Sequence, residues 1–280
     1  MATTVQPSDK SVSVDGTQLH YLDWGTAGKP LMVLLHGLRG HAHSWDTFSA
    51  AMCVDYHVLA LDQRGRGDSG WAKDGQYTTD LYVSDLLGFS EALQLDPFLL
   101  VGHSMGGRNG IAFSSQYPQK VQKLVLVDIG PTGDPRGGER IRREILDAPE
   151  QFASFEQAID YTNKGNRFAP PDILRRRVQY QTKVQPDGTL VWRYDPAIRE
   201  QWRKGTNTTV DLWPAFRQIS CPILIVRGVE SDILGPEHAQ LMLDANPRAQ
   251  LVEIQRAAHM VFEENPDDFL SAMRAYLQAR

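Results

Sequence analysis

The sequence predicts an α/β protein with a mostly parallel twisted sheet flanked by helices and an inserted, mainly helical cap. Three observations favour this class. Short apolar runs alternate with helical patterns over residues 1–130, the alternation stops over residues 131–211, and it resumes over residues 212–280. Because strands that alternate with helices are typical of parallel sheets, residues 1–130 and 212–280 are expected to form the core and residues 131–211 the cap.

The core segments contain short apolar runs that predict strands and periodic stretches that predict helices. Continuous apolar runs such as residues 31–36 suit strands that are buried on both faces of a sheet. The expected strands are residues 18–23, 31–36, 56–62, 98–101, 121–129, 222–226 and 250–254. The expected helices are residues 44–53, 79–95, 105–117, 236–245 and 266–278.

The interrupting segment has helical patterns at residues 139–146, 152–163 and 171–181. A turn, Pro186-Asp187-Gly188, separates two extended stretches and predicts a small hairpin. The segment also holds slightly more Lys and Arg than Asp and Glu, although the whole chain is acidic. A relatively basic cap is compatible with a small-molecule substrate that bears a carboxylate, although a solvated helical surface is the preferred interpretation of these charges.

Composition and charge exclude several classes of protein. The formal net charge of the 280 residues is −5, whereas nucleic-acid binders show a strongly basic face, so no nucleic-acid partner is expected. No apolar run is long enough for a transmembrane helix, and no membrane partner is expected. Residues 1–10 lack the apolar stretch of a signal peptide, and two distant cysteines, Cys53 and Cys221, make no disulfide framework. We therefore expect a cytoplasmic protein with reduced thiols.

Ser104 lies between two glycines in the stretch Gly102-His103-Ser104-Met105-Gly106, directly after an expected strand and before an expected helix. A serine that projects from so sharp a turn leaves no room for side chains two residues away on either side, and glycine removes that collision. This G-x-S-x-G pattern between a strand and a helix is that of a nucleophile elbow. The sequence therefore predicts Ser104 as a catalytic nucleophile.

A serine nucleophile needs a general base and an acid that orients the base. His259 follows the last expected strand, at the carboxyl edge of the sheet where Ser104 also lies, and is the expected base. Asp232, after the strand at residues 222–226, is the preferred acid. Asp128, at the end of the strand before the cap, is the alternative acid, and Glu230 is a weaker third candidate. The chain order of serine, acid and histidine holds for each of them.

An oxyanion hole requires two N–H donors near the nucleophile. Met105 supplies one at the start of the helix, and Leu38, in the loop His36-Gly37-Leu38, is expected to supply the other. His36 is expected to support this loop through hydrogen bonds. His41 and His43 raise the question of a metal, but no cysteine lies nearby and the carboxylates are scattered, so neither a metal nor a cofactor is expected.

Together these residues resemble the α/β-hydrolase family. The likeness covers residues 11–130 and 212–280 and rests on five landmarks in order. They are His36-Gly37 with Trp45 after it, the run Asp62-Gln63-Arg64-Gly65-Arg66-Gly67-Asp68-Ser69, the Gly102–Gly106 turn, Asp232, and His259. The resemblance implies the α/β-hydrolase fold with Ser104 as nucleophile, His259 as base and Asp232 as the orienting acid. It does not define the reaction, because this fold hosts many chemistries.

Within the family the chain resembles cap-containing bacterial hydrolases of amide and enamide acids, the group of 2-(acetamidomethylene)succinate hydrolase. This likeness rests on Gly106-Gly107-Arg108-Asn109 and on residues 185–194. Some of those enzymes take the acid from the position of Asp128, but because Asp232 is also present in this chain, the resemblance is not expected to extend to that departure. Members that cleave carbon–carbon bonds often carry tryptophan after the catalytic histidine, where this chain has Met260. Epoxide hydrolases and dehalogenases of this fold carry aspartate in place of Ser104.

The function expected from the sequence is a serine hydrolase that cleaves a small carboxylic ester or amide through an acyl-enzyme intermediate. Two alternatives stay open: a carbon–carbon hydrolase of ring-cleavage ketoacids, and a non-catalytic receptor that binds a ligand in the same cavity. Four side chains are candidates for binding substrate: Arg39, Arg108, Trp192 and Tyr194.

Overall fold

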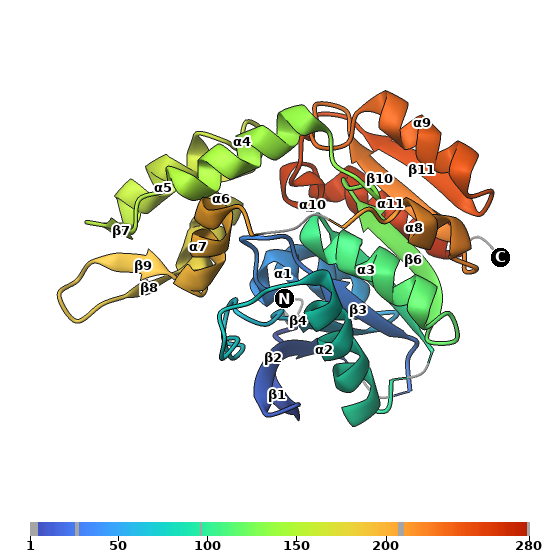
Figure 1. Cartoon of the computed structure of the whole chain (residues 1–280), viewed down its shortest axis with the longest axis horizontal. Helices are drawn as coiled ribbons and strands as arrows, with labels where there is room; N and C mark the ends of the chain where they lie inside the picture. Colours follow the sequence, from blue (N-terminus) through green and yellow to red (C-terminus); the bar gives the residue numbers. More distant parts are fainter. Residues whose placement is uncertain (1–4, 26–27, 96, 207–209, 279–280) are drawn as a thin grey trace.

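The computed structural model describes residues 5–25, 28–95, 97–206 and 210–278, and its main element is an eight-stranded sheet (Figure 1). The strand order is β1-β2-β4-β3-β5-β6-β10-β11. β2 pairs antiparallel with β1 and β4, and the other neighbours pair parallel, which confirms the predicted fold class. The strands are β1 (Ser8–Val14), β2 (Thr17–Trp24), β3 (Leu31–Leu35), β4 (His57–Leu61), β5 (Phe98–His103), β6 (Val121–Val127), β10 (Ile223–Gly228) and β11 (Ala249–Ile254).

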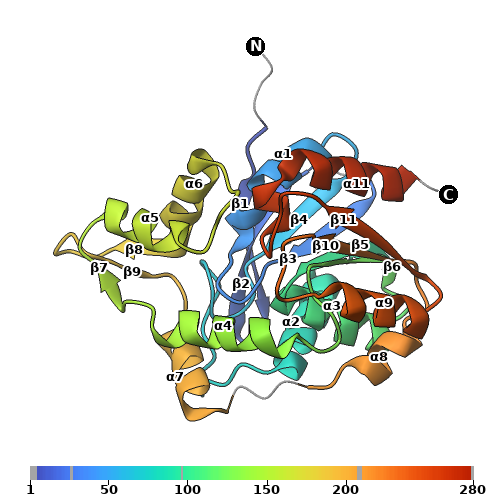
Figure 2. The ribbon, with the colours of Figure 1, turned by 90° about the horizontal axis from the view of Figure 1, so that it is seen from above.

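Helices cover both faces of the sheet (Figure 2). One face carries α1 (Asp46–Met52), which follows the short 3-10 helix η1 (Ala42–Trp45), together with α10 (Val261–Glu264) and α11 (Pro266–Gln278). The other face carries α2 (Thr79–Ala92), α3 (Met105–Gln116), α8 (Trp213–Gln218) and α9 (Pro236–Ala245). Each face therefore has its own apolar cluster, which explains why the central strands read as continuous apolar runs.

β1 is the strand of the main sheet that the sequence did not predict. Its residues, SDKSVSV, are mostly polar and exposed, and it lies at the edge of the sheet, so no apolar run marks it. It forms because β2 provides a full antiparallel partner, from Ser8 opposite Asp23 to Val14 opposite Thr17. A polar edge strand of this kind is a common way to limit pairing with other chains.

The elements from α4 to α7 form a separate layer beside the carboxyl ends of the strands (Figures 1 and 2). They include a three-stranded sheet of order β7-β9-β8 and an apolar cluster of their own. The elements are α4 (Pro135–Leu146), β7 (Gln151–Phe152), α5 (Phe155–Asn163), α6 (Pro171–Gln181), β8 (Thr182–Val184), β9 (Leu190–Trp192) and α7 (Pro196–Lys204). That this layer is a domain of its own and acts as a cap stays a prediction.

The predicted hairpin is present, with β8 and β9 paired antiparallel on either side of the turn at Gly188. The helix α7 was missed, although its boundaries carry clear signals. The Asp195 side chain caps its N-terminus by accepting from the Ala197 N–H, Pro196 opens it, and Gly205 ends it in a left-handed conformation.

The turn between β5 and α3 places Ser104 at the carboxyl edge of the sheet. Ser104 has φ 52°, which is a strained conformation for a residue other than glycine. The flanking glycines are required by close packing. A Cβ on Gly102 would lie 2.5 Å from the Gly106 carbonyl oxygen, and a Cβ on Gly106 would lie 2.5 Å from the Leu35 carbonyl oxygen. The collision argued from the sequence is therefore confirmed.

Gly102→Ala is expected to lower the free energy of unfolding by about 1–3 kcal/mol, because the new methyl group meets backbone atoms that cannot move aside. Gly138→Ala is the matched control, since Gly138 lies in α4 with nothing within 4 Å of an added Cβ. That change is expected to stabilise by up to ~1 kcal/mol. Urea unfolding of both variants checks the prediction, and equal midpoints for the two would contradict it.

Candidate active site

Ser104, His259 and Asp128 form a hydrogen-bonded chain at the carboxyl edge of the sheet. The His259 Nε2 atom lies 3.0 Å from Ser104 Oγ, and its Nδ1 atom lies 2.8 Å from Asp128 Oδ2. Three elements supply these residues: the turn after β5, the end of β6, and the loop between β11 and α10. Because β5 and β6 pair parallel, with His103 opposite Val127, Ser104 and Asp128 leave the sheet side by side.

Asp128 is a fully buried carboxylate with a hydrogen-bond partner for each oxygen. Its Oδ1 accepts from the Gly228 N–H at 3.1 Å, and its Oδ2 accepts from the Ser231 hydroxyl at 2.5 Å as well as from His259. Like Ser104, Asp128 has φ 52°. Two non-glycine residues in the left-handed region at one site are typical of functional positions that the surrounding structure holds in place.

The expectation that Asp232 is the hydrogen-bond partner of His259 is wrong. The Asp232 carboxylate instead forms a two-point ion pair with Arg140 of α4, with Nε to Oδ2 at 2.6 Å and Nη2 to Oδ1 at 2.8 Å. The hydrogen bond from Arg140 holds the pKa of Asp232 below its usual value. The neighbouring Ser231 reaches Asp128 from the same loop. Glu230, the third candidate, is exposed and does not contact His259 in the described structure.

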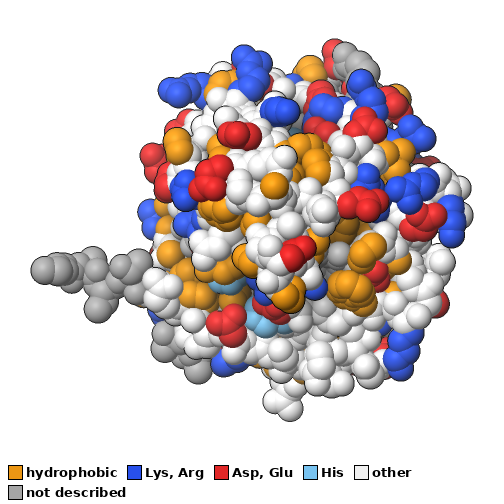
Figure 3. Space-filling model, turned by 90° about the vertical axis from the view of Figure 1, so that its left-hand side faces the viewer, with side chains coloured by type: hydrophobic (Ala, Val, Ile, Leu, Met, Phe, Trp, Pro, Cys, Tyr) orange, Lys and Arg blue, Asp and Glu red, His pale blue; other side chains and the backbone are white. Residues whose placement is uncertain are grey.

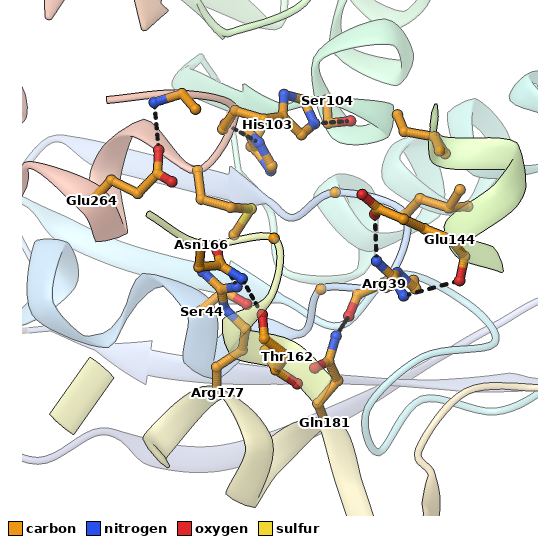
Figure 4. Close-up of a pocket in the computed structure, with 18 of the residues that line it drawn as sticks. Arg39, Ser44, His103, Ser104, Glu144, Thr162, Asn166, Arg177, Gln181 and Glu264 are labelled. Carbon is orange, nitrogen blue, oxygen red and sulfur yellow. Dashed lines mark hydrogen bonds and ion pairs between the residues drawn. The ribbon is translucent and has the colours of Figure 1, made fainter. Parts of the chain in front are cut away.

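A cavity of about 510 Å³ opens onto Ser104 and His259 (Figure 4). Core residues and residues of α4, α5 and α6 line it together, so the segment between β6 and β10 forms one wall. The charged lining residues are Arg39, Arg140, Lys164, Arg177, Glu144, Glu230, Asp232 and Glu264. This volume lies within the range of small-molecule binding sites.

Both expected oxyanion donors lie beside the nucleophile. Met105 opens α3, where the first N–H groups of a helix have no intrahelical partner. Gly37 packs against Ser104, since a Cβ on Gly37 would lie 3.2 Å from the Ser104 Cβ, and Leu38 follows it in the cavity wall. The Leu38 carbonyl accepts a hydrogen bond from Arg66 Nε at 3.1 Å, which fixes the peptide between Leu38 and Arg39 in the same loop.

His36 supports this loop as the sequence predicted. Its Nδ1–H donates to the Gly37 carbonyl at 2.7 Å, and its Nε2 accepts from the Gln63 N–H at 3.0 Å, so the ring is neutral. Burial lowers the pKa of His36 to about 4. The Gln63 side chain donates to the His36 carbonyl and accepts from Asn109 of α3. The run after β4 thus ties the loop of Leu38 to the helix that follows Ser104.

The four candidates for substrate binding divide into two groups. Arg39 and Trp192 line the cavity, although Arg39 is paired with Glu144 at 2.8 Å and the Trp192 indole donates to the Pro149 carbonyl at 2.7 Å. The structure contradicts a direct substrate contact for Arg108, which lies outside the cavity lining and donates to the Pro131 carbonyl at 2.6 Å.

Tyr194 is the fourth candidate, and the structure contradicts its contact with substrate as well. Its ring is buried in the apolar cluster of the β7-β9-β8 layer, outside the cavity lining, and stacks on Trp192 with ring centroids 5.9 Å apart. Arg108 and Tyr194 therefore serve packing: Arg108 holds the backbone just after Asp128, and Tyr194 supports Trp192 from behind.

Sequence reasoning missed several residues that surround the hydrogen-bonded chain of Ser104, His259 and Asp128. His103 donates from Nε2 to the His259 carbonyl at 2.9 Å, and Glu264 accepts from the Ala258 N–H at 2.5 Å. Arg177 of α6 pairs with Glu263 of α10, both buried, and donates to Asn166 at 2.7 Å. The position of His103 inside the G-x-S-x-G motif was a signal. The role of Arg177 had none, because its run Arg175-Arg176-Arg177 reads as a solvated helix surface.

The one group of side chains with metal-ligand spacing among the described residues is His20, Asp62 and Asp68. Its members serve hydrogen bonds: His20 Nδ1 lies 2.8 Å from Asp62 Oδ2, and Asp62 accepts from the N–H groups of Ala42 and Asp68. The group lies outside the cavity lining. His43 stacks on Tyr180 with ring centroids 3.5 Å apart and bonds to Asp46.

The comparisons with known proteins identify the family to which this fold belongs. Residues 32–272 match the model of the alpha/beta hydrolase family. A 3-hydroxybutyrate-oligomer hydrolase of Cupriavidus necator is 31% identical over 255 residues, which are 86% of this chain and 87% of that protein. The chain therefore belongs to the alpha/beta hydrolase family.

A sequence relative and a solved structure are both named as 2-(acetamidomethylene)succinate hydrolase. The enzyme of Mesorhizobium japonicum is 27% identical over 251 residues, 89% of this chain and 88% of that protein. A crystal structure of E-2-(acetamidomethylene)succinate hydrolase superimposes with a TM-score of 0.89 at 25% identity, covering 98% of this chain and 100% of the other. The resemblance seen in the sequence is confirmed, and the named relatives support a hydrolytic enzyme. Among the described helices, none is long and apolar enough to span a membrane.

Acidification is expected to destabilise the fold between pH 7 and pH 5 because of buried neutral histidines. Burial lowers the pKa of His36 to about 4, of His41 to about 3, and of His103 well below its usual value. Below about pH 6.5 the unfolded chain therefore binds more protons than the folded chain, and stability is lost as pH falls. His20 acts in the opposite direction. Burial lowers its pKa, but the hydrogen bond and charge of Asp62 outweigh burial, so the pKa of His20 is raised.

The expected loss is about 2 kcal/mol or more, measured by urea unfolding at the two pH values. His41→Met is the matched variant, because it removes one of the three contributing rings and keeps an apolar side chain against Tyr180, whose ring centroid lies 6.0 Å from that of His41. Its loss between pH 7 and pH 5 is expected to be smaller by roughly 1 kcal/mol. A stability that rises toward pH 5 would contradict the argument.

Proposed function

We propose that this protein is a serine hydrolase that cleaves a small carboxylic ester or amide through an acyl-enzyme intermediate. The observation that carries the proposal is the chain from Ser104 Oγ through His259 to the buried Asp128 carboxylate, at 3.0 Å and 2.8 Å. Ser104 is the nucleophile, His259 the general base, and Asp128 the orienting acid. This assignment replaces Asp232, whose carboxylate is held by Arg140.

The proton path follows from the tautomer of His259. A carboxylate can only accept, so Nδ1 carries a proton toward Asp128 and the neutral ring offers its Nε2 lone pair to the Ser104 hydroxyl. As Ser104 Oγ attacks the substrate carbonyl, Nε2 takes the hydroxyl proton, and the Asp128 carboxylate stabilises the imidazolium. Nε2 then gives that proton to the leaving alkoxide or amine as the acyl-enzyme forms. A water molecule repeats the sequence and releases the acid.

The N–H groups of Leu38 and Met105 stabilise the negative charge that develops on the substrate's carbonyl oxygen. Each such donor is typically worth about 10²–10³ in rate, because it is fixed before the reaction begins. The Leu38 N–H shares its peptide with the Gly37 carbonyl, which accepts from His36 Nδ1 at 2.7 Å, while α3 fixes the N–H of Met105. No cofactor is needed for these steps.

Two observations support a small, polar substrate. The cavity of about 510 Å³ has charged side chains of both signs in its wall, and Lys164 is a cation of that wall with no ion pair among the described residues. The relatives named as hydrolases of 3-hydroxybutyrate oligomers and of 2-(acetamidomethylene)succinate act, by name, on an ester of a hydroxy acid and on an amide that bears carboxylates. We propose a carboxylate-bearing substrate of one of these classes. We also propose that the protein is located in the cytoplasm.

Ser104→Ala and His259→Ala are each expected to lose at least ~10³-fold in kcat against p-nitrophenyl acetate and butyrate, because each removes one end of the nucleophile–base pair. A fluorophosphonate probe should label the parent at Ser104 and leave Ser104→Ala unlabelled. Labelling without ester turnover would move the proposal to amide acids as substrates. If there is neither turnover nor labelling, the catalytic proposal fails and a non-catalytic receptor becomes the better account.

Asp128→Asn and Asp232→Asn separate the two candidate acids. The first is expected to lower kcat by about 10²–10⁴, because an amide no longer fixes the Nδ1–H tautomer of His259. The second loses an ion pair with Arg140 at a half-exposed position and is expected to change kcat by less than ~10-fold. The reverse order of the two effects in steady-state kinetics would restore Asp232 as the acid.

A further inference from the structure

The loop that carries His259 is held at two successive residues. It joins β11 to α10, and its conformation determines where the imidazole points. The Ala258 N–H donates to the Glu264 carboxylate at 2.5 Å, and the His259 carbonyl accepts from His103 Nε2 at 2.9 Å. These contacts hold the backbone on either side of the His259 Cα, one from α10 and one from the end of β5.

Glu264 is buried, lines the cavity, and reaches back from the last turn of α10 to the loop before it (Figure 4). A buried carboxylate is costly unless it accepts hydrogen bonds. Burial raises the pKa of Glu264, while the bond from Ala258 and the charges of Arg177 and His259 lower it. Its Oε2 is thus used to hold a backbone N–H, and not to bind a neighbouring cation as Glu263 does.

His103 is buried beside His259 and directly precedes Ser104 in the chain. A Cβ on Gly37 would lie 2.7 Å from its Nδ1, and its ring centroid lies 4.6 Å from that of His259. A carbonyl oxygen only accepts, so Nε2 of His103 carries the proton in the contact with His259. Burial and the charge of His259 hold the pKa of His103 well below its usual value, so the ring stays neutral while it donates.

We propose that His103 and Glu264 are positioning residues of the hydrolase: together they clamp the His259 backbone so that its ring meets Ser104 and Asp128 at once. This inference deepens the proposed function and rests on it. The His259 ring must hydrogen-bond to Ser104 at 3.0 Å and to Asp128 at 2.8 Å at the same time, although its side chain is partly exposed and lies on a loop. A displacement of about 1 Å in such a pair typically costs about 10²-fold in rate.

Glu263 and Glu264 provide a matched comparison on one helix. Both are buried in α10, but Glu263 binds Arg177 of α6, whereas Glu264 binds the loop of His259. If the clamp is the role of Glu264, the two glutamates must differ in their effect on kcat. If burial in α10 is all that matters, they must have the same effect.

The experiment compares Glu264→Ala, Glu264→Gln and Glu263→Gln in steady-state ester hydrolysis and in the rate of Ser104 labelling by a fluorophosphonate. Glu264→Ala is expected to lower kcat and the labelling rate by about 10–100-fold with KM within ~3-fold. Glu264→Gln is expected to stay within ~3-fold of the parent, since its amide oxygen accepts from the Ala258 N–H. Glu263→Gln is expected to lower Tm and keep kcat within ~3-fold.

Parental kcat and labelling in Glu264→Ala would overturn the inference, as would an equal loss of kcat in Glu263→Gln. If Glu264→Ala does not fold, His103→Leu and His103→Gln give the same test, because glutamine can still donate to the His259 carbonyl and leucine cannot. The proposed function fails separately: in that case the parent neither hydrolyses esters nor is labelled, or Ser104→Ala remains active.

Discussion

The hydrogen bond between His259 Nδ1 and the buried Asp128 carboxylate is the interaction on which the rest of this site depends. It fixes the tautomer of the histidine, and the tautomer decides that Nε2 faces Ser104 as an acceptor. The bond is possible because β5 and β6 end side by side and the backbone leaves each strand with a positive φ, at Ser104 and at Asp128. The register between β5 and β6 therefore determines whether Ser104 and Asp128 can both reach His259.

Around this interaction, several polar side chains hold the loops and the carboxylate of the site in place. His36 and Gln63 hold the loop of Leu38, Ser231 holds Asp128, and His103 and Glu264 hold the loop of His259. Such groups satisfy hydrogen bonds that burial makes obligatory, and they limit the movement of the loops that carry the reacting atoms. Stability and alignment thus come from the same contacts, and the buried neutral rings of His36 and His103 take part in both at a cost in stability at low pH.

Local signals in the sequence were enough for the core strands, for the elbow and for His259, because apolar runs, glycines and turn residues act over a few positions. The polar edge strand β1 and the helix α7 were missed, since β1 depends on its partner and the signals of α7 lay in a polar segment. The choice of Asp232 failed for a non-local reason. Whether an aspartate after β10 faces His259 depends on Arg140, 92 residues away along the chain, and no pattern near Asp232 reveals that ion pair.

The same ion pairs revise the interpretation of the basic cap. Lys, Arg, Asp and Glu side chains are interspersed on the face that shows this segment, with hydrophobic side chains between them (Figure 3). At the cavity, Arg39 and Arg140 share Glu144, and Arg140 also holds Asp232. A substrate carboxylate that used these arginines would have to compete with carboxylates already in place. Recognition of an anionic substrate would therefore exchange existing ion pairs between core and cap for new ones. The gain in binding free energy would be the difference between two similar interactions, and not the full strength of one.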